Sequence, residues 1–473
     1  MMLQFSGARA LVMGLGLNGG GLESALFLLR RGAELTITDL RDAAVLQPSI
    51  AVLDDAVRNL NAPPVRYVLG THEMNDFETA DVVIKNPAVR PDSPYLKAAQ
   101  RIETDISLFL RENPARLLAV TGSKGKSFTS SALCYGLEAH HRSAGKGAAY
   151  LGGNITISPL RFLEQLGADD DVVLELSSWQ LADLPEDLLK PRIAVLTAIM
   201  PDHLDRYGTM DAYIADKKRI YRNQDAQDLT IVYNGTWSAG FMRETRARLL
   251  CYGEQTAVAG ACGWFSAADG GCYARGPLGL LNADQQVELI GSQCVTPGAH
   301  QKINLLGAGL ALLDLGLEPE FIRRTLAVFP GLEHRLEFFC EKNGVRFVND
   351  SAATIPEAAA AAVTALGSPV LITGGTDKAL DFTPLVNAAR QAKKIILLAG
   401  SASDKLTGLF AQAGIAYAGP FTTVDAALDA ALDAAAAGDT VVLSPGCTSF
   451  GMFKNEFDRG RQWKAAVLAL GQR

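Results

Sequence analysis

The sequence predicts a three-domain α/β protein in which helices cover parallel sheets. Three observations carry this prediction. The 473 residues exceed what one hydrophobic core supports. Apolar runs of strand length alternate with helical segments along most of the chain. Two of these runs lead straight into glycine-rich loops. We expect a first domain over residues 1–110, a central domain over 111–331 and a third domain over 332–473.

The first domain opens with a strand over residues 10–13 and the loop "GLGLNGG", in which Gly14, Gly16 and Gly19 follow G-x-G-x-x-G spacing. A helical segment (22–31) and a second strand ending at Asp39 come next. This is a Rossmann-like, dinucleotide-binding arrangement, with glycines for the close approach of a diphosphate and an acid for a ribose hydroxyl. Alone, it favours NAD. The alternative is an ordinary glycine turn of a parallel sheet.

The central domain begins with a strand over residues 117–120 that enters a second loop. Its backbone N–H groups, a helix N-terminus and a mobile lysine suit a phosphate, and its serine suits a metal ion. Val120 stands where the standard G-x-x-x-x-G-K-[ST] pattern has its first glycine, so a plain turn with two lysines remains the alternative. The loop consists of Gly122, Ser123, Lys124, Gly125, Lys126 and Ser127.

Polar side chains follow the next two apolar runs of this domain. Glu175 follows the apolar run of the segment "DVVLELSSWQL", and His203 follows that of "RIAVLTAIMPDHLDRYG". The carboxyl ends of parallel strands meet at one edge of a sheet, where ligands gather. Each residue alone could be a helix cap or a surface group. Together with the phosphate loop they favour a Mg²⁺–nucleotide site, because Mg²⁺ takes oxygen ligands and phosphate oxygens.

In the rest of the chain, the local patterns predict strands and helices but indicate no catalytic or binding residues. Residues 231–295 are irregular, and we expect strands and loops that decorate the central domain. From residue 332, the strands "VRFVND", "PVLITGG", "KIILLAG" and "DTVVLSPG" alternate with helical segments, which predicts a Rossmann-like, doubly wound sheet. The alanine-rich segment 424–439 is periodic and predicts an amphipathic helix.

Composition limits the function. A net charge of −7 argues against nucleic acid and acidic membranes as partners, but it allows small anionic substrates. Seven scattered cysteines without a C-x-x-C pair argue against a disulfide framework or structural zinc. The first twenty residues lack the pattern of a secretory signal, so we expect a cytoplasmic protein, and a monomer.

Motifs along nearly the whole chain resemble those of the Mur ligase superfamily, and most of all its glutamate-adding members. They are "GLGLNGG", "TDLR", "TGSKGKS", "GGNI", "ELSSWQL", "DHLDRYG", "YIADKKRIY", "GLEHRLE", "NDSAAT", "GGTDKALDF" and "LSPGCTSFGMFKNEFDRG". The resemblance implies a central P-loop-type ATPase domain between two Rossmann-like domains. It also explains the short phosphate loop, since this family has G-T-x-G-K-[ST].

The resemblance replaces NAD with a UDP-sugar in the first domain. It implies that the first glycine loop binds the diphosphate and that the residues after the second strand meet the uracil. The UDP-sugar set would be Gly14, Leu15, Gly16, Leu17, Asn18, Gly19, Asp39, Leu40, Arg41 and Asn86, with Asn154 and His203 from the central domain.

The implied reaction is ATP-driven addition of glutamate to UDP-N-acetylmuramoyl-L-alanine through an acyl phosphate, a step of peptidoglycan precursor synthesis. Lys126 would neutralise phosphates, Asn154 would orient the substrate carboxylate, and Ser127, Glu175 and His203 would hold two Mg²⁺ ions. The resemblance aligns Lys217 with a lysine that CO₂ carbamylates, which turns a cation into a metal-binding anion. Without the family, Lys217 would be a solvated helix lysine, and Lys218 an equal candidate.

The third domain would complete both substrate sites. Arg335 and Asp350 would reach ATP together with Gln301 and Asn304, and the glutamate set would be Thr354, Lys378, Ser449 and Glu456. Three positions depart from the family pattern: Gln301 replaces an asparagine, Ala352 a lysine, and Glu456 a phenylalanine. The last two fall in the glutamate pocket, so an L-glutamate-adding variant remains open, with D-glutamate favoured by its frequency in the family.

Other functions explain fewer of these residues. A ligase that adds lysine or diaminopimelate, or a folylpolyglutamate synthase, fits "ELSSWQL", "DHLDRYG" and the Lys378–Ser449 pair less well. A NAD-dependent dehydrogenase leaves the lysine loop, Glu175 and His203 without a role. A non-catalytic nucleotide-binding scaffold leaves the whole catalytic set unexplained.

Overall fold

Three sheets organise the chain in the computed structural model, which describes residues 4–17, 19–254, 262–296, 298–378, 380–449 and 451–470. The chain forms two compact units. One unit comprises Met1–Ile290 with Ile303–Thr325, and the other Gly291–Lys302 with Leu326–Arg473. Each unit is described by itself below.

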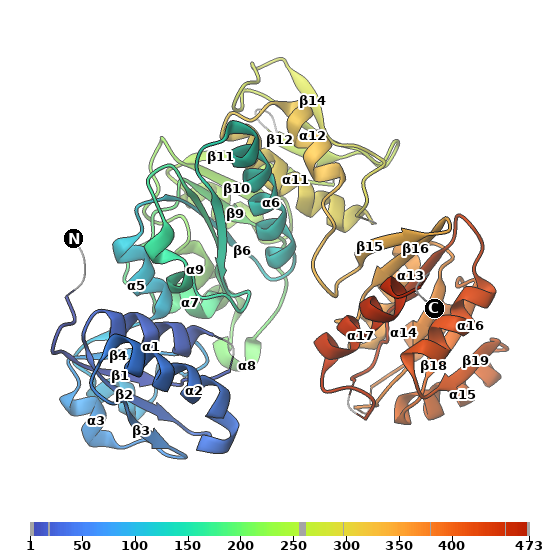
Figure 1. The fold of residues 1–473 in the computed structure, drawn as a ribbon. Coiled ribbons are helices and arrows are strands. Elements are labelled where there is room, and N and C mark those ends of the chain that lie inside the picture. The colour runs from blue at the N-terminus through green and yellow to red at the C-terminus, as the bar shows by residue number, and fades with distance from the viewer. Residues whose placement is uncertain are drawn as a thin grey trace. The chain divides into compact units, whose positions relative to one another are not determined.

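The first sheet is parallel throughout and has the strand order β3-β2-β1-β4-β5 (Figure 1). The chain adds strands on one side of β1 and then crosses to β4 on the other side. The carboxyl ends of β1 and β4 therefore flank the crevice where such sheets bind ligands. The strands are β1 (Arg9–Met13), β2 (Glu34–Asp39), β3 (Arg66–Leu69), β4 (Val82–Lys85) and β5 (Ile102–Glu103), with helices α1 (Gly20–Arg30), α2 (Ala43–Leu60), α3 (Met74–Thr79) and α4 (Pro94–Ala98).

The second sheet has the order β14-β13-β12-β11-β10-β9-β6-β8-β7, antiparallel only from β12 to β14. Its strands are β6 (Arg116–Thr121), β7 (Ala149–Gly153), β8 (Asp171–Glu175), β9 (Ile193–Leu196), β10 (Leu229–Tyr233), β11 (Arg248–Gly253), β12 (Cys262–Phe265), β13 (Cys272–Arg275) and β14 (Gln286–Ile290). Its helices include α6 (Lys126–Ala144), α7 (Ser178–Asp183), α8 (Leu204–Tyr207), α9 (Met210–Lys218) and α10 (Ser238–Glu244). The strands expected within residues 231–295 are present. They extend the main sheet instead of decorating it, because β10 pairs with β9 in register.

The first two sheets share one apolar core, which explains why they form one unit. Helix α5 (Asp105–Glu112) leads from the first sheet to the second, and its Phe109 packs edge-on against Phe162 of the central domain, ring centroids 6.0 Å apart. A buried ion pair adds a polar link between the same parts, since Lys85 at the end of β4 donates to Asp183 at the end of α7. Burial lowers the pKa of Lys85 and raises the pKa of Asp183.

The third sheet has the order β15-β16-β20-β17-β18-β19 and is parallel except for the β15 edge. Its strands are β15 (Glu337–Lys342), β16 (Val345–Asn349), β17 (Val370–Thr373), β18 (Lys394–Leu398), β19 (Tyr417–Phe421) and β20 (Thr440–Leu443). Its helices are α13 (Pro356–Leu366), α14 (Thr383–Ala389), α15 (Ser401–Gln412), α16 (Val424–Ala434) and α17 (Glu456–Leu468), drawn with the strands in orange and red in Figure 1. Helix α16 confirms the helix expected from the alanine-rich periodicity.

The predicted three-domain α/β architecture is confirmed, with an N-terminal sheet of dinucleotide-binding order, a central sheet that carries the phosphate loop, and a doubly wound C-terminal sheet. The boundaries at residues 110 and 331 stay predictions. Among the residues that the structure describes, no helix has both the length and the apolar composition that crossing a membrane requires.

Candidate functional site

The loop between β6 and α6 contains two glycines that its shape requires. Gly122 has φ 152° and Gly125 has φ 90°, values that favour glycine. A Cβ at Gly122 would lie 1.9 Å from the Thr197 hydroxyl, and one at Gly125 would lie 2.4 Å from Oδ1 of Asn304. The loop ends at the N-terminus of α6, where backbone N–H groups favour an anion.

Two lysines bind the same carbonyl of this loop. Lys126 donates to the carbonyl oxygen of Gly122 at 3.0 Å, and Lys217 of α9 donates to it at 2.8 Å. Lys217 is fully buried, and its Nζ lies 4.6 Å from the centre of the Tyr213 ring. Burial, with a smaller contribution from the charge of Lys126, lowers the pKa of Lys217 to about 7. Lys218, by contrast, pairs with Glu244 at 2.6 Å, which distinguishes the two neighbouring lysines.

Ser123 braces the loop from within. Its hydroxyl accepts from the Met200 N–H at 2.9 Å and lies 3.0 Å from the Tyr213 hydroxyl. Of the other two loop residues, Lys124 is exposed and Ser127 is half-buried in the first turn of α6. The loop is thus held from α9 and from the segment after β9.

Glu175 and Asn154 stand at the carboxyl ends of β8 and β7. The Asn154 amide donates to Oε1 of Glu175 at 2.9 Å. Oε2 of Glu175 is buried and has no hydrogen-bond partner among the residues that the structure describes. An ionised carboxylate oxygen without a partner is costly to bury, so it calls for a cation or a donor from a ligand. This oxygen fits a metal ion.

His203 lies at the start of α8, with φ 53°. Its ring is 5.1 Å from the ring of Trp179, its Nε2 is 3.8 Å from Asp202, and its side chain is about half exposed. On the described part of the chain, no group of three or more His, Cys, Asp or Glu residues could hold a metal ion. A metal here would therefore depend on ligand oxygens as well as on the protein.

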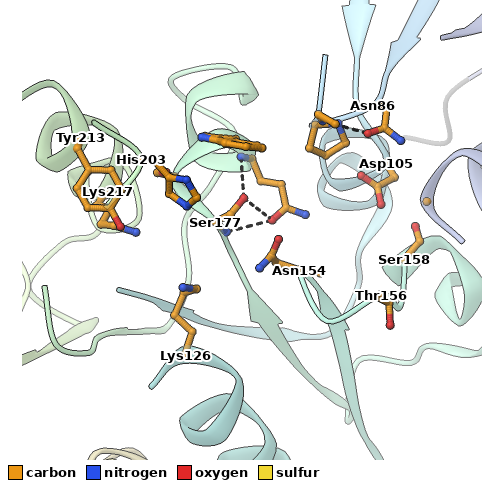
Figure 2. A pocket seen from close by; sticks show the side chains of 17 residues that line it. Asn86, Asp105, Lys126, Asn154, Thr156, Ser158, Ser177, His203, Tyr213 and Lys217 are labelled. Carbon is orange, nitrogen blue, oxygen red and sulfur yellow. Dashed lines mark hydrogen bonds between the residues drawn. The ribbon is translucent and has the colours of Figure 1, made fainter. Parts of the chain in front are cut away.

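Five of these residues line one cavity of about 430 Å³: Lys126, Asn154, His203, Tyr213 and Lys217. Figure 2 shows Lys126, His203 and Asn154 around one end of it, with Asn86, Asp105 and Ser158 around the other. Gly20, at the N-terminus of α1, also lines the cavity. One space therefore joins the end of the first glycine loop to the lysine of the second.

The first glycine loop is organised by Asp39. Its Oδ2 accepts from the N–H of Gly16 at 3.2 Å, and its Oδ1 accepts from the N–H of Arg41 at 2.9 Å. The carboxylate predicted to meet a nucleoside thus also holds the loop in shape. The N–H of Asn86 donates to the Met13 carbonyl oxygen at 3.2 Å, which fixes Asn86 beside the same crevice.

The other residues expected in the UDP-sugar set differ in exposure. Leu15 is buried, whereas Leu17 and Leu40 are exposed, with 51% and 69% of their surface accessible. Gly14 and Gly19 both have positive φ, at 93° and 92°. Asn18 lies outside the described residues.

Asp105 is a site residue that the sequence reasoning missed. It is buried at the first position of α5 and lines the cavity, and burial raises its pKa. Thr104 and Ser107 form a capping box around it. A Thr-x-x-Ser pattern before an apolar run was the available signal, but such a pattern indicates a helix start and no ligand.

Gln301 and Asn304, both expected to contact ATP, have different surroundings. Asn304 lies against Gly125 of the phosphate loop. Gln301 is buried, and its Oε1 has no hydrogen-bond partner within the described ranges. The departure from asparagine at 301 therefore leaves a longer amide whose carbonyl can still accept from a ligand.

The remaining predicted residues lie in the unit that contains the third sheet. Asp350 follows β16, and its carboxylate accepts from Ser444 at 2.6 Å and from the N–H of Leu336 at 3.0 Å. Burial raises the pKa of Asp350 to about 7. Arg335 is exposed and directly precedes Leu336, whose N–H binds Asp350.

The four residues of the predicted glutamate set all lie in this unit. Ser449 is buried, Thr354 and Glu456 are half-buried, and Lys378 is exposed. Ser449 follows β20, Thr354 follows β16, Lys378 follows β17, and Glu456 begins α17. Three of the four therefore follow the carboxyl ends of parallel strands, where a ligand is expected.

Comparison with known proteins identifies the family. Residues 120–312 match the model of the Mur ligase middle domain, and residues 334–447 match the Mur ligase, glutamate ligase domain. Among solved structures, the fold resembles MurF from Acinetobacter baumannii (TM-score 0.57, 15% identity, 98% of this chain and 93% of that chain). It also resembles UDP-N-acetylmuramate-alanine ligase MurC from Thermotoga maritima (TM-score 0.56, 18% identity, 98% and 99%). The fold is that of the Mur ligases.

Relatives narrow the identification. The chain is 40% identical to the UDP-N-acetylmuramoylalanine–D-glutamate ligase of Treponema pallidum (strain Nichols), over 98% of both chains. It is 40% identical to the enzyme of the same name from Roseiflexus sp. (strain RS-1), over 98% of this chain and 99% of the relative. The chain belongs to the Mur ligase family and, within it, to the group of these glutamate ligases.

Replacing Gly125 tests the phosphate loop. Gly125→Ala should weaken ATP–Mg²⁺ binding at least about tenfold, or about 1.4 kcal/mol, because the added methyl would displace Asn304 or the loop. Gly145→Ala is the matched control, since Gly145 caps the other end of α6 with φ 65° and no atom lies within 4 Å of its added Cβ. Both variants should lose about 1–2 kcal/mol of folding stability, from the left-handed backbone. Titration calorimetry that finds equal ATP affinities in the two variants would contradict the assignment.

Proposed function

We propose that this protein is an ATP-dependent ligase that joins D-glutamate to UDP-N-acetylmuramoyl-L-alanine. The observation that carries the proposal is the shared cavity, which is lined by Gly20 and Asn86 from the first sheet and by Lys126 from the phosphate loop. A sugar nucleotide bound at the first loop would thus extend toward a phosphate bound at the second. The names of the relatives at 40% identity support the same substrates.

In the proposed reaction, a carboxylate oxygen of the substrate alanine attacks the γ-phosphorus of ATP, and ADP leaves. The amine of glutamate then attacks the carbonyl carbon of the acyl phosphate, loses a proton, and expels phosphate. The protein aligns two anions and neutralises their charge. Lys126 lies at the helix N-terminus where the phosphates would bind, and Asn154 stands at the cavity wall where it would orient the carboxylate.

Two Mg²⁺ ions complete the proposed site. Bound Mg²⁺ would neutralise phosphate charge and position phosphate oxygens. Glu175 would hold one ion through its unpartnered Oε2, with the Ser127 hydroxyl, and His203 would lie by the second. Lys217 would join the second ion's ligands after carbamylation, in which the neutral amine adds to CO₂ and releases a proton. A lysine with its pKa lowered to about 7 supplies that neutral amine at physiological pH.

The amino-acid pocket is assigned to the third domain. Lys378, Ser449 and Thr354 would bind the carboxylates of glutamate, and Arg335 and Asp350 would contact ATP with Gln301 and Asn304. The relatives' names favour D-glutamate. The alternative, L-glutamate, rests on the departures at Ala352 and Glu456. We place the enzyme in the cytoplasm as a monomer, with the domain boundaries predicted from the sequence.

Phosphate release tests the proposed function and the stereochemistry. With UDP-N-acetylmuramoyl-L-alanine and ATP–Mg²⁺, the wild-type protein should release phosphate rapidly with D-glutamate and far more slowly with L-glutamate. Lys126→Ala should lower kcat by about 10²–10³, the usual cost of removing a group that stabilises transition-state charge. A preference for L-glutamate would favour the alternative. The absence of phosphate release with either isomer would exclude the ligase.

The pH profile and chemical rescue test Lys217. The amine becomes increasingly protonated as the pH falls through about 7, so activity that depends on carbamylation should fall as the pH drops and should rise with added bicarbonate. Lys217→Ala should be nearly inactive, and formate or acetate should restore part of its activity by supplying a carboxylate. Lys218→Ala is the matched control and should stay active, since Lys218 pairs with Glu244. If Lys218→Ala is inactive and Lys217→Ala is active, the assignment is wrong.

A further inference from the structure

Arg459 is a charged side chain that the proposed mechanism does not use. It lies in α17 and is 0% exposed, among the largest fully buried side chains of the described chain. Arginine is almost never fully buried unless it is paired, because removing its charge from water is expensive. Its hydrogen-bond partners among the residues that the structure describes are one hydroxyl and two backbone carbonyl oxygens, and none is a carboxylate. Its burial therefore requires another explanation.

The guanidinium instead binds two loops of its unit. It donates to the Ser351 carbonyl oxygen at 2.8 Å, to the Ser351 hydroxyl at 2.9 Å and to the Cys447 carbonyl oxygen at 3.2 Å. The Ser351 hydroxyl in turn donates to the Glu456 carbonyl oxygen at 2.7 Å. One side chain thus ties together the loop after β16, the loop after β20 and the first turn of α17.

Residues of the proposed amino-acid pocket lie on these three segments. Ser449 is two residues after Cys447, Thr354 is three residues after Ser351, and Glu456 begins α17. The loop after β20 also contacts the loop after β17, since Thr376 and Thr448 pair through backbone hydrogen bonds of 3.0 and 3.2 Å. That loop carries Lys378. The packing is tight, because a Cβ added at Gly375 would lie 2.6 Å from the Thr448 carbonyl oxygen and 3.7 Å from Nη1 of Arg459.

The positive charge of Arg459 would favour an anionic substrate in the neighbouring pocket. Burial lowers its pKa to about 10, so it remains a cation at neutral pH. Its hydrogen bonds go to neutral oxygens, and the carboxylates of Glu456 and Asp350 interact with its charge but accept none of these hydrogen bonds. Glutamate brings two carboxylates, and charge interactions are strong where water is excluded. A buried cation would favour such a substrate and would offset the lysine absent at Ala352.

We propose that Arg459 is the positioning residue of the amino-acid pocket, which it serves by fixing the loops after β16 and β20 and by adding positive charge beneath them. This inference rests on the proposed function, because it takes glutamate as the ligand of those loops. Arg459 acts through Ser351 and Cys447 and need not touch the substrate.

Steady-state kinetics with all three substrates tests the proposal. Arg459→Met should raise the glutamate KM by about 10- to 150-fold, because the pocket loops lose the charge-assisted hydrogen bonds that fix them. The fold-increase in the KM values for ATP and for the UDP-sugar should be at least ten times smaller than the fold-increase in the glutamate KM. Arg459→Lys keeps the charge but lacks the fork of donors, so its glutamate KM should fall between those of the wild type and Arg459→Met.

Trp463→Phe is the matched control. Trp463 is also buried in α17, and its indole N–H donates to the Val348 carbonyl oxygen at 3.2 Å, away from the pocket loops. It should lower the Tm without changing the glutamate KM. An unchanged glutamate KM in folded Arg459→Met, or an equal rise in Trp463→Phe, would overturn the proposal. If Arg459→Met does not fold, an unchanged glutamate KM in Arg459→Lys overturns it. Wild-type protein that uses no glutamate would refute the proposed function itself, before any variant is compared.

Discussion

The Gly122 carbonyl oxygen, bound by two lysines, is the interaction on which the rest of the site depends. Lys126 reaches it from the helix that the loop begins, and Lys217 reaches it from α9. The two ammonium groups are close enough that the charge of Lys126 helps to lower the pKa of Lys217. One loop thus has both a positive charge, on Lys126, and a neutral amine, on Lys217. The positive charge suits phosphates, and the neutral amine suits reaction with CO₂.

A single cavity is possible because the domains of the first two sheets are packed against each other and joined by a buried ion pair. The apolar core is continuous between them, and the buried pair of Lys85 with Asp183 links the end of β4 to α7. Lys85 directly precedes Asn86, which lines the cavity, and Asp183 ends the helix that carries Trp179 and Gln180 on the facing wall. Breaking such a pair leaves an uncompensated charge, so the link resists separation of the walls. The distance between the first glycine loop and the loop that carries Lys126 is therefore set by the fold.

Local patterns in the sequence predicted the strand–loop–helix elements well. Glycine spacing identified both loops because Gly14, Gly19 and Gly125 adopt positive φ, which is a property of the single residue. The resemblance to Mur ligases selected Lys217 over Lys218. The structure supports that choice by burying Lys217 against Tyr213.

Residues whose roles depend on distant contacts were not predictable. Asp39 was expected to meet a nucleoside, yet its carboxylate also braces Gly16, a contact across 23 positions of the chain. Asp105 and Arg459 lie in ordinary helix patterns, and only folding brings the first to the cavity and the second to Ser351 and Cys447. The extension of the central sheet through β10–β14 was missed for the same reason, because strand pairing is decided between segments.

The most direct test of carboxylate attack on ATP in the shared cavity is to follow one labelled oxygen atom. If the substrate carboxylate attacks ATP within the shared cavity, UDP-N-acetylmuramoyl-L-alanine labelled with ¹⁸O in its terminal carboxylate should transfer one ¹⁸O to the released phosphate in each turnover. Mass spectrometry of the phosphate, after reaction with ATP–Mg²⁺ and D-glutamate, measures that transfer. One label per phosphate is the predicted result. Unlabelled phosphate formed together with the amide product would contradict an acyl-phosphate reaction and the placement of both substrates in one cavity.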